Sequence, residues 1–137
     1  MNVPARIAVG YDGSPGSKAA LRWAAALARA LGATLQVVHA VGLLEHAGLA
    51  SVSAREEPAR AVTAGAGMEA NRVEWCVVEG DPDLVLCGVA EGPGAADLLV
   101  VGTRRTDGPP GLLGSTSLKL VARAPVPVVV VPGTVPG

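Results

Sequence analysis

The chain has 137 residues, of which 50% are hydrophobic and 17% charged, and its formal net charge is −1. This length fits one folded domain over residues 1–137, and the apolar content excludes a disordered chain. The balanced charge provides no positive face for nucleic acid. No apolar run approaches the length that crosses a membrane, so we expect no membrane partner either.

The start of the chain and its two cysteines indicate a cytoplasmic protein. The opening residues MNVPARIAVGYD lead directly into a strand pattern and do not resemble a signal peptide. Cys76 and Cys87 lack CxxC spacing and lie among apolar residues, which is typical of small core side chains in a reduced protein. A disulfide between them would be unusual in that compartment. The His and Cys residues lack zinc-ligand spacing, so we predict no metal site.

Short apolar runs alternate with helical patterns along the chain. The first run, RIAVG at 6–10, is continuous, as in a strand that is buried on both faces. Ser14 and Pro15 predict the N-cap and first residue of a helix that ends at Gly32. A loop is expected at 42–53. The other expected elements are strands at 34–41, 72–78, 97–102 and 126–131, and helices at about 54–69, from 81 to near 92, and at 115–123.

Five strands that alternate with four helices predict an α/β fold, with a mostly parallel sheet and helices on both faces. Ligands of such sheets bind beyond the carboxyl ends of the strands, where the strand order reverses. The order 3-2-1-4-5 would bring the turn after the first strand and the loop after the fourth to one crevice. The flavodoxin-like order 2-1-3-4-5 would place the short acidic loop 79–81 there instead. The first order accounts better for the long glycine-rich loop.

Two segments at this crevice carry suitable chemistry. Gly114, Ser115 and Thr116 stand at the start of the last helix, where backbone N–H groups and the helix dipole favour an anion. Asp12 follows the first strand, and its carboxylate suits ribose hydroxyls. Both segments also have an ordinary structural interpretation, because Ser115 is a common N-cap and Asp12 a common turn residue before glycine. Spacing alone favours the structural interpretation.

Three further residues are interpreted as structural. His39 lies inside a strand pattern, and we expect it to be packed and hydrogen-bonded. Trp23 and Trp75 are expected to be packing residues and not a stacking platform for a ligand.

Taken together, these motifs resemble the universal stress protein family. The similar pieces, in chain order from Arg6 to Pro132, are IAVGYDGSPGSKAAL, LQVVHAV, GDPD, ADLLVVGTR, LLGSTS and APVPVVVVP. Their order and spacing together are specific. The resemblance implies a Rossmann-like sheet of order 3-2-1-4-5, of the adenine-nucleotide α-hydrolase type, in a cytoplasmic homodimer that serves stress response. It also implies a division, since some members bind ATP and others do not.

The ATP-binding members resemble one another in the pattern G-2x-G-9x-G-[ST]. Gly102 matches its first glycine, and Gly114 with Ser115 matches the closing pair. Arg105 stands at the second glycine, and only eight residues separate it from Gly114. A glycine there permits positive φ and close approach to phosphate, which an arginine forfeits. Arg104 and Arg105 offer guanidinium groups that could contact phosphates instead.

The resemblance also implies a nucleotide site. Asp12 matches the acidic position near the nucleoside, and Tyr11 and the backbone around Ala40 would flank adenine. The residues implied to hold phosphates are Gly102, Gly114, Ser115 and Thr116, helped by Arg104 or Arg105. We therefore expect ATP, with or without Mg²⁺, or another adenine nucleotide between the first and fourth strands.

An alternative stays open at this point. Arg105 and the shortened loop favour a member of the same family that binds no nucleotide and acts as a dimeric signalling or interaction module. No general base or metal cage can be named, so efficient ATP hydrolysis is not predicted, and slow turnover stays open.

The last strand is an edge strand in the order 3-2-1-4-5. The run VPVVVVP is apolar and flat, and a bare edge of this kind is prone to aggregation. Pairing with the same strand of a second copy would cover the edge symmetrically. Pro127 and Pro132 limit the length of that pairing. We therefore expect a homodimer through Val126–Val131.

Overall fold

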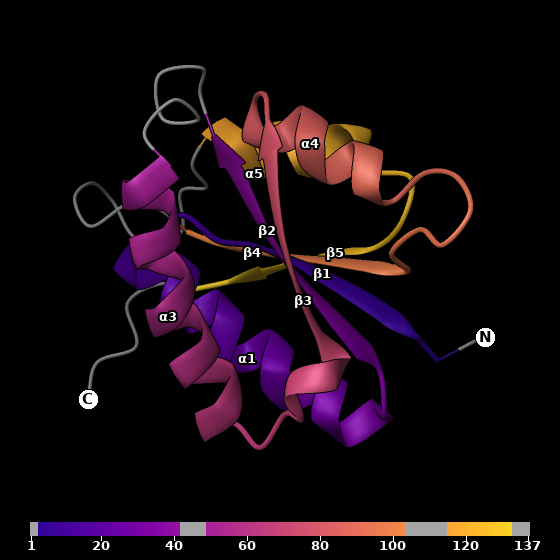
Figure 1. The fold of residues 1–137 in the computed structure, drawn as a ribbon. Coiled ribbons are helices and arrows are strands. Elements are labelled where there is room, and N and C mark those ends of the chain that lie inside the picture. The colour runs from indigo at the N-terminus through magenta and orange to yellow at the C-terminus, as the bar shows by residue number, and fades with distance from the viewer. Residues whose placement is uncertain (1–2, 42–48, 104–114, 133–137) are drawn as a thin grey trace.

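The computed structural model describes residues 3–41, 49–103 and 115–132, with the backbone alone at 49–54 and 115. Parallel strands form one five-stranded sheet of order β3-β2-β1-β4-β5, which confirms the expected order (Figure 1). The strands are β1 (Arg6–Gly10), β2 (Thr34–Val41), β3 (Val73–Glu79), β4 (Leu98–Gly102) and β5 (Val128–Val131). The helices are α1 (Pro15–Leu31), α3 (Leu49–Gly65), α4 (Pro82–Val89) and α5 (Ser115–Arg123), with a 3₁₀ turn at Ala70–Arg72.

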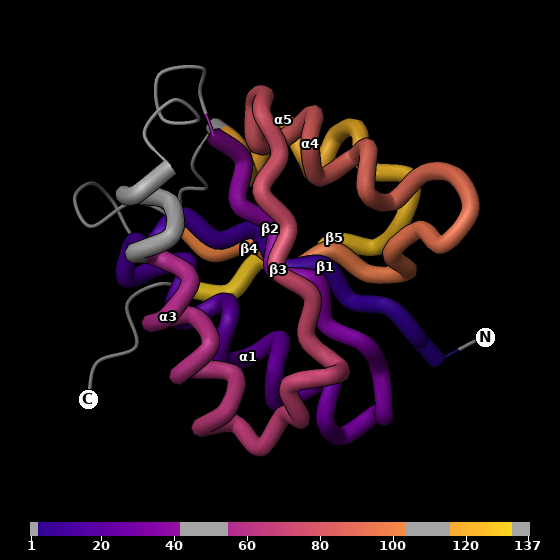
Figure 2. Tube along the Cα trace, in the orientation of Figure 1, coloured from indigo at the N-terminus to yellow at the C-terminus, as the bar shows by residue number. Residues whose placement is uncertain are grey.

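Helices cover both faces of the sheet, as predicted. α1 and α3 lie on one face, and α4 and α5 lie on the other, with the twisted sheet between the two layers (Figure 2). β1 shows why its sequence is apolar throughout: Ile7 and Val9 join the core under α1, whereas Ala8 joins the core under α4 and α5. A strand at the centre of a parallel sheet has no face for polar side chains.

The helix α1 begins and ends where its sequence predicts. The Ser14 side chain accepts a hydrogen bond from the backbone N–H of Ser17 at 3.2 Å, and Pro15 opens the first turn. Gly32 ends the helix with φ 68°, in the left-handed region where glycine has no Cβ penalty. These two ends fix the path from β1 to β2, and with it the turn that carries Asp12.

The helix α3 differs from the sequence prediction at both ends. It begins at Leu49, inside the predicted loop 42–53, and it ends at Gly65 instead of near Glu69. The described part of the helix packs on α1 and buries Ala59, and tertiary packing of this kind outweighs weak local propensity. The early end reflects Gly67, whose φ of 86° is incompatible with a continuing helix.

Two smaller boundaries also differ. α4 ends at Val89 and not near residue 92, because the N–H of Ala90 turns back to the carbonyl of Cys87. β5 begins at Val128 and not at residue 126. Pro127 has no N–H to give to a ladder, although its carbonyl accepts from the N–H of Leu99 at 3.0 Å.

The predicted burial of the cysteines and tryptophans is confirmed for some of these residues and not for others. Cys76 and Cys87 are free and half-buried beside the core under α4 and α5, and burial raises the pKa of both thiols. Trp75 packs against the other core as predicted, but Trp23 is 40% exposed on α1, so its predicted packing role is wrong. Within the described ranges, no helix has the length and apolarity needed to span a membrane.

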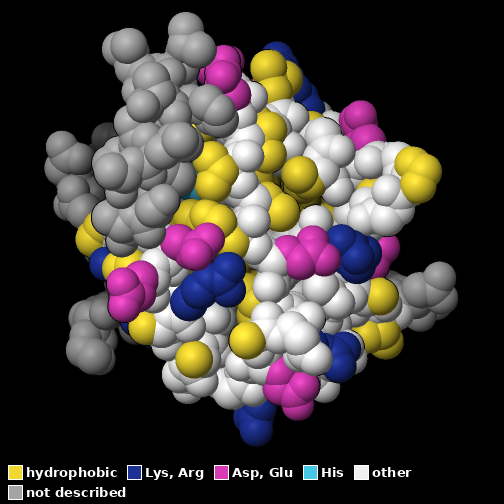
Figure 3. All heavy atoms as spheres, viewed as in Figure 1, with side chains coloured by type: hydrophobic (Ala, Val, Ile, Leu, Met, Phe, Trp, Pro, Cys, Tyr) yellow, Lys and Arg dark blue, Asp and Glu magenta, His cyan; other side chains and the backbone are white. Residues whose placement is uncertain are grey.

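The two edges of the sheet have different surfaces. Near β3, acidic and basic side chains lie next to one another (Figure 3). Arg6 and the β3 residue Glu74 pair at 3.5 Å, and Arg60 and Glu56 of α3 pair at 3.2 Å. β5, at the other edge, consists of four valines. Charged side chains discourage pairing with a strand of another chain, so the edge at β3 is protected. The valines of β5 give its edge no such protection.

Candidate functional site

A pocket of about 380 Å³ opens where the strand order reverses, between the carboxyl ends of β1 and β4. Its walls come from the turn after β1, the ends of β2 and β4, the starts of α4 and α5, and one side chain of α3. This volume lies in the range of small-molecule sites, and this position is where open parallel sheets bind ligands.

The structure brings together those predicted site residues that it describes in full. Tyr11, Asp12, Ala40, Gly102 and Thr116 all line the pocket. Ser115 is the first residue of α5, but its side chain lies outside the described residues, as do Arg104, Arg105 and Gly114 entirely.

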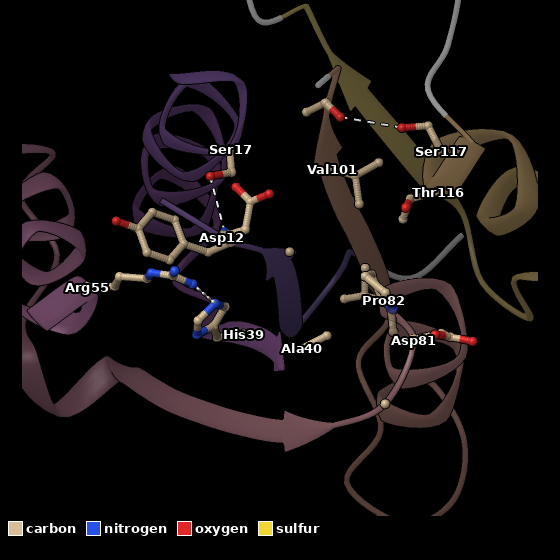
Figure 4. Close-up of a pocket in the computed structure, with 15 residues that line it drawn as sticks. Asp12, Ser17, His39, Ala40, Arg55, Asp81, Pro82, Val101, Thr116 and Ser117 are labelled. Carbon is tan, nitrogen blue, oxygen red and sulfur yellow. Dashed lines mark hydrogen bonds between the residues drawn. The ribbon is translucent and has the colours of Figure 1, made fainter. Parts of the chain in front are cut away.

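Asp12 is oriented by the turn between β1 and α1 (Figure 4). Its Oδ1 accepts a hydrogen bond from the backbone N–H of Ser14 at 2.9 Å, and its own N–H donates to Ser17 Oγ at 3.2 Å. The turn continues through Gly13, whose φ is 86°. The structural interpretation of Asp12 is therefore correct. It does not exclude a ligand role, because the same turn holds the carboxylate at the pocket wall.

Gly102 has a packing role that the sequence did not reveal. A Cβ on Gly102 would collide with the carbonyl oxygen of Gly16, in the first turn of α1. The carbonyl of Gly102 accepts a hydrogen bond from Ser117 Oγ at 3.4 Å. The glycine is thus required for α1 to cross the end of β4, whether or not a phosphate binds there.

The first turn of α5 faces the pocket from the side opposite Asp12 (Figure 4). Thr116 and the buried Ser117 both line the cavity, and the hydroxyl of Thr116 is directed towards it (Figure 4). Backbone N–H groups in the first turn of a helix have no partner within the helix and carry the positive end of its dipole. This wall is therefore suited to an anionic group.

Two pocket residues, His39 and Arg55, were not predicted to belong to a site. Arg55 Nη1 lies 3.0 Å from Nε2 of His39. A guanidinium can only donate, so Nε2 accepts this hydrogen bond and the ring is the tautomer with its proton on Nδ1. His39 is 1% exposed, which confirms that it is packed and hydrogen-bonded, but it also contributes to the pocket wall.

An aromatic cluster supports this wall. The ring of Tyr11 meets those of His39 and Trp75 edge-on, with centroids 6.5 and 5.8 Å apart. Burial raises the pKa of the Tyr11 phenol, the charge of Asp12 raises it further, and Arg55 lowers it. These ring contacts pack the β1–β2 side of the pocket against Trp75 of β3.

Asp81 also lines the pocket, although the sequence analysis connected its loop, 79–81, with the crevice only under the flavodoxin-like strand order. It stands at the N-cap of α4, yet its side chain makes no capping hydrogen bond there, and it lines the pocket. Over the described ranges, no three His, Cys, Asp or Glu side chains are grouped so that they could hold a metal ion.

The sequence signals for these missed residues are weak. Arg55 lies one turn before the buried Ala59, and this spacing places both on the inward side of α3. Asp81 follows Gly80, whose φ of 142° marks a sharp exit from β3. Neither signal identifies a pocket without knowledge of how the elements pack.

Comparisons with known proteins agree with this fold. The model of the universal stress protein family matches residues 5–132. A universal stress protein solved in complex with cAMP is 29% identical, with a TM-score of 0.81 over 97% of this chain and 100% of that one. A protein from Mycobacterium tuberculosis H37Rv is 30% identical, with a TM-score of 0.63 over 96% and 97%. A family member from Burkholderia pseudomallei is 26% identical, with a TM-score of 0.73 over 93% and 96%. No curated protein sequence matches the chain.

Proposed function

This chain belongs to the universal stress protein family, and from that premise we propose that its pocket binds an adenine nucleotide. The observation that carries the proposal is the opposition of the Asp12 carboxylate and the first turn of α5 across one pocket. A carboxylate suits ribose hydroxyls and a helix N-terminus suits phosphate, which are two ends of one nucleotide. The similar structure that holds cAMP supports adenine as the base.

The proposed arrangement uses the residues of the sequence prediction. Ala40 and Tyr11 flank the base, Asp12 holds the ribose, and Thr116 with the first N–H groups of α5 holds phosphate. The remaining residues proposed to contact phosphate are Gly102, Arg104, Arg105, Gly114 and Ser115. ATP, with or without Mg²⁺, is the first ligand to test.

Isothermal titration of the full chain with ATP, AMP and cAMP tests this proposal. Asp12→Asn keeps an oxygen for the N–H of Ser14 but removes the charge, so it should weaken binding of each ligand about tenfold or more, in line with a charge-assisted hydrogen bond. The control Glu69→Gln changes an exposed charge outside the pocket and should leave affinity unchanged. Failure of the unaltered protein to bind any of these ligands would refute the proposal.

One observation favours a second function. Arg105 replaces the glycine that would let backbone approach a phosphate, and the loop to Gly114 is one residue short of the ATP-binding pattern. These features favour a signalling or interaction module that uses the same fold without a nucleotide. A chain that binds no nucleotide but still self-associates would support this alternative.

We further propose that the protein is a cytoplasmic homodimer that serves stress response, with the two copies paired through β5. The apolar edge strand supports the pairing, since the charged side chains near β3 protect the other edge. Two free cysteines and the family resemblance support the compartment.

A further inference from the structure

Arg55 places a guanidinium group at the pocket, on the side of Asp12 and away from Thr116 (Figure 4). It comes from α3, one turn before the buried Ala59. Its positive charge acts on Tyr11, the neighbour of Asp12, where it opposes the effects that raise the pKa of the phenol. The guanidinium therefore belongs to the end of the pocket opposite the first turn of α5.

A hydrogen bond to a buried side chain helps to hold this group in place. Arg55 Nη1 donates to Nε2 of His39 at 3.0 Å, and His39 is itself fixed by burial and by Trp75, whose ring centroid lies 6.1 Å away. The aliphatic part of Arg55 runs close to Gly13, where a Cβ would lie 3.7 Å from its Cδ. A half-buried arginine held in this way is oriented before a ligand arrives, which lowers the entropic cost of using it.

The chemistry of the neighbours shows what Arg55 would contact. In the proposed arrangement, the first turn of α5 holds the phosphate and Asp12 holds the ribose. The base is then the part of the nucleotide that lies towards Arg55. A guanidinium is planar, stacks on aromatic rings and donates to ring nitrogens. We propose that Arg55 contacts the purine base with its guanidinium plane, and that His39 is its positioning residue. This inference rests on the nucleotide-binding function proposed above.

The test is calorimetric titration of the full chain with adenosine, AMP and ATP. Arg55→Met should weaken binding about tenfold, as expected for a partly desolvated cation–π contact, and by the same factor for all three ligands. Arg55→Lys should lose most of the same affinity, because it keeps the charge but not the plane. The control is Arg60→Met, which removes an exposed arginine of the same helix, paired with Glu56 at 3.2 Å outside the pocket, and should change nothing.

The positioning role of His39 has its own measurement. His39→Leu removes the acceptor for Arg55 and should weaken adenosine binding, whereas adding it to Arg55→Met should cause no further loss. Independent losses that multiply in the double variant would overturn the positioning role. Arg55→Lys retains the positive charge and most of the aliphatic side chain. If Arg55→Met or His39→Leu fails to fold, the ligand affinities of Arg55→Lys are compared with those of the unaltered protein instead.

The outcomes separate this inference from the proposed function. A loss that grows with the number of phosphates would assign Arg55 to the phosphates and overturn the inference, as would unchanged adenosine affinity in Arg55→Met. In both cases the unaltered protein still binds nucleotide, so the proposed function stands. If the unaltered protein binds none of the three ligands, the proposed function fails and this inference fails with it.

Discussion

At the scale of single residues, several pocket groups serve the fold and the site together. Asp12 caps its own turn through Oδ1 and still faces the cavity. His39 is buried in β2 and still holds Arg55 at the pocket. A structural role therefore does not argue against a role in the pocket, since the contacts that stabilise the fold also orient the side chains that line the cavity.

Tyr11 gives a direct probe of this coupling, because it is the single tyrosine of the chain. Burial, and then the charge of Asp12, raise the pKa of its phenol. Titration by ultraviolet absorbance should therefore show a midpoint above about 10, the value of a free tyrosine. Asp12→Asn should lower this midpoint, and Arg55→Met should raise it, because Arg55 opposes the shift.

The same shift has a consequence for stability. The folded chain holds the phenolic proton to a higher pH than the unfolded chain, so Tyr11 leaves the free energy of unfolding constant below about pH 10 and lowers it above. Tyr11→Phe should remove this part of the alkaline loss in denaturant unfolding. A folded protein whose Tyr11 titrates at or below the free value would contradict the prediction.

At the scale of elements, the crossing of α1 over the end of β4 positions both halves of the site. α1 follows the turn that carries Asp12, and α5 is the next described element after β4. The approach is so close that a Cβ on Gly102 would strike the backbone of Gly16. The distance between Asp12 and the first turn of α5 therefore depends on this contact.

Gly102→Ala should accordingly destabilise the protein by about 1–3 kcal/mol, as overpacking against backbone does. The matched control is Gly88→Ala in α4, where a Cβ meets nothing within 4 Å and the helical backbone favours alanine. That control should stabilise the protein by up to about 1 kcal/mol. Urea unfolding of both variants measures the difference, and equal effects would show that the contact at Gly102 relaxes easily.

At the scale of the whole molecule, the parts that could be predicted are those with local signals. Continuous apolar runs and helix caps predict the sheet and its helices, and the topology then places Asp12, Ala40 and Thr116 at one pocket. Arg55 was missed, although it lies in a predicted helix, because its place at the pocket depends on how α3 packs on α1. Non-local contacts of this kind leave no periodic pattern to recognise.

β5 is the last strand in the sheet order, and this position leads to a prediction about assembly. The carbonyls of Pro127 and Val131 accept from the N–H groups of Leu99 in β4 and of Thr103 directly after it, so the alternate residues Val128 and Val130 direct their backbone groups to the outer edge. A second copy paired there would use the N–H of Val130. Val130→Pro removes that N–H while the ladder to β4 keeps its own groups, so it should abolish the proposed pairing and give a monomer in light scattering. Val130→Thr keeps the N–H and should remain dimeric, and a monomeric unaltered protein at micromolar concentration would contradict the pairing.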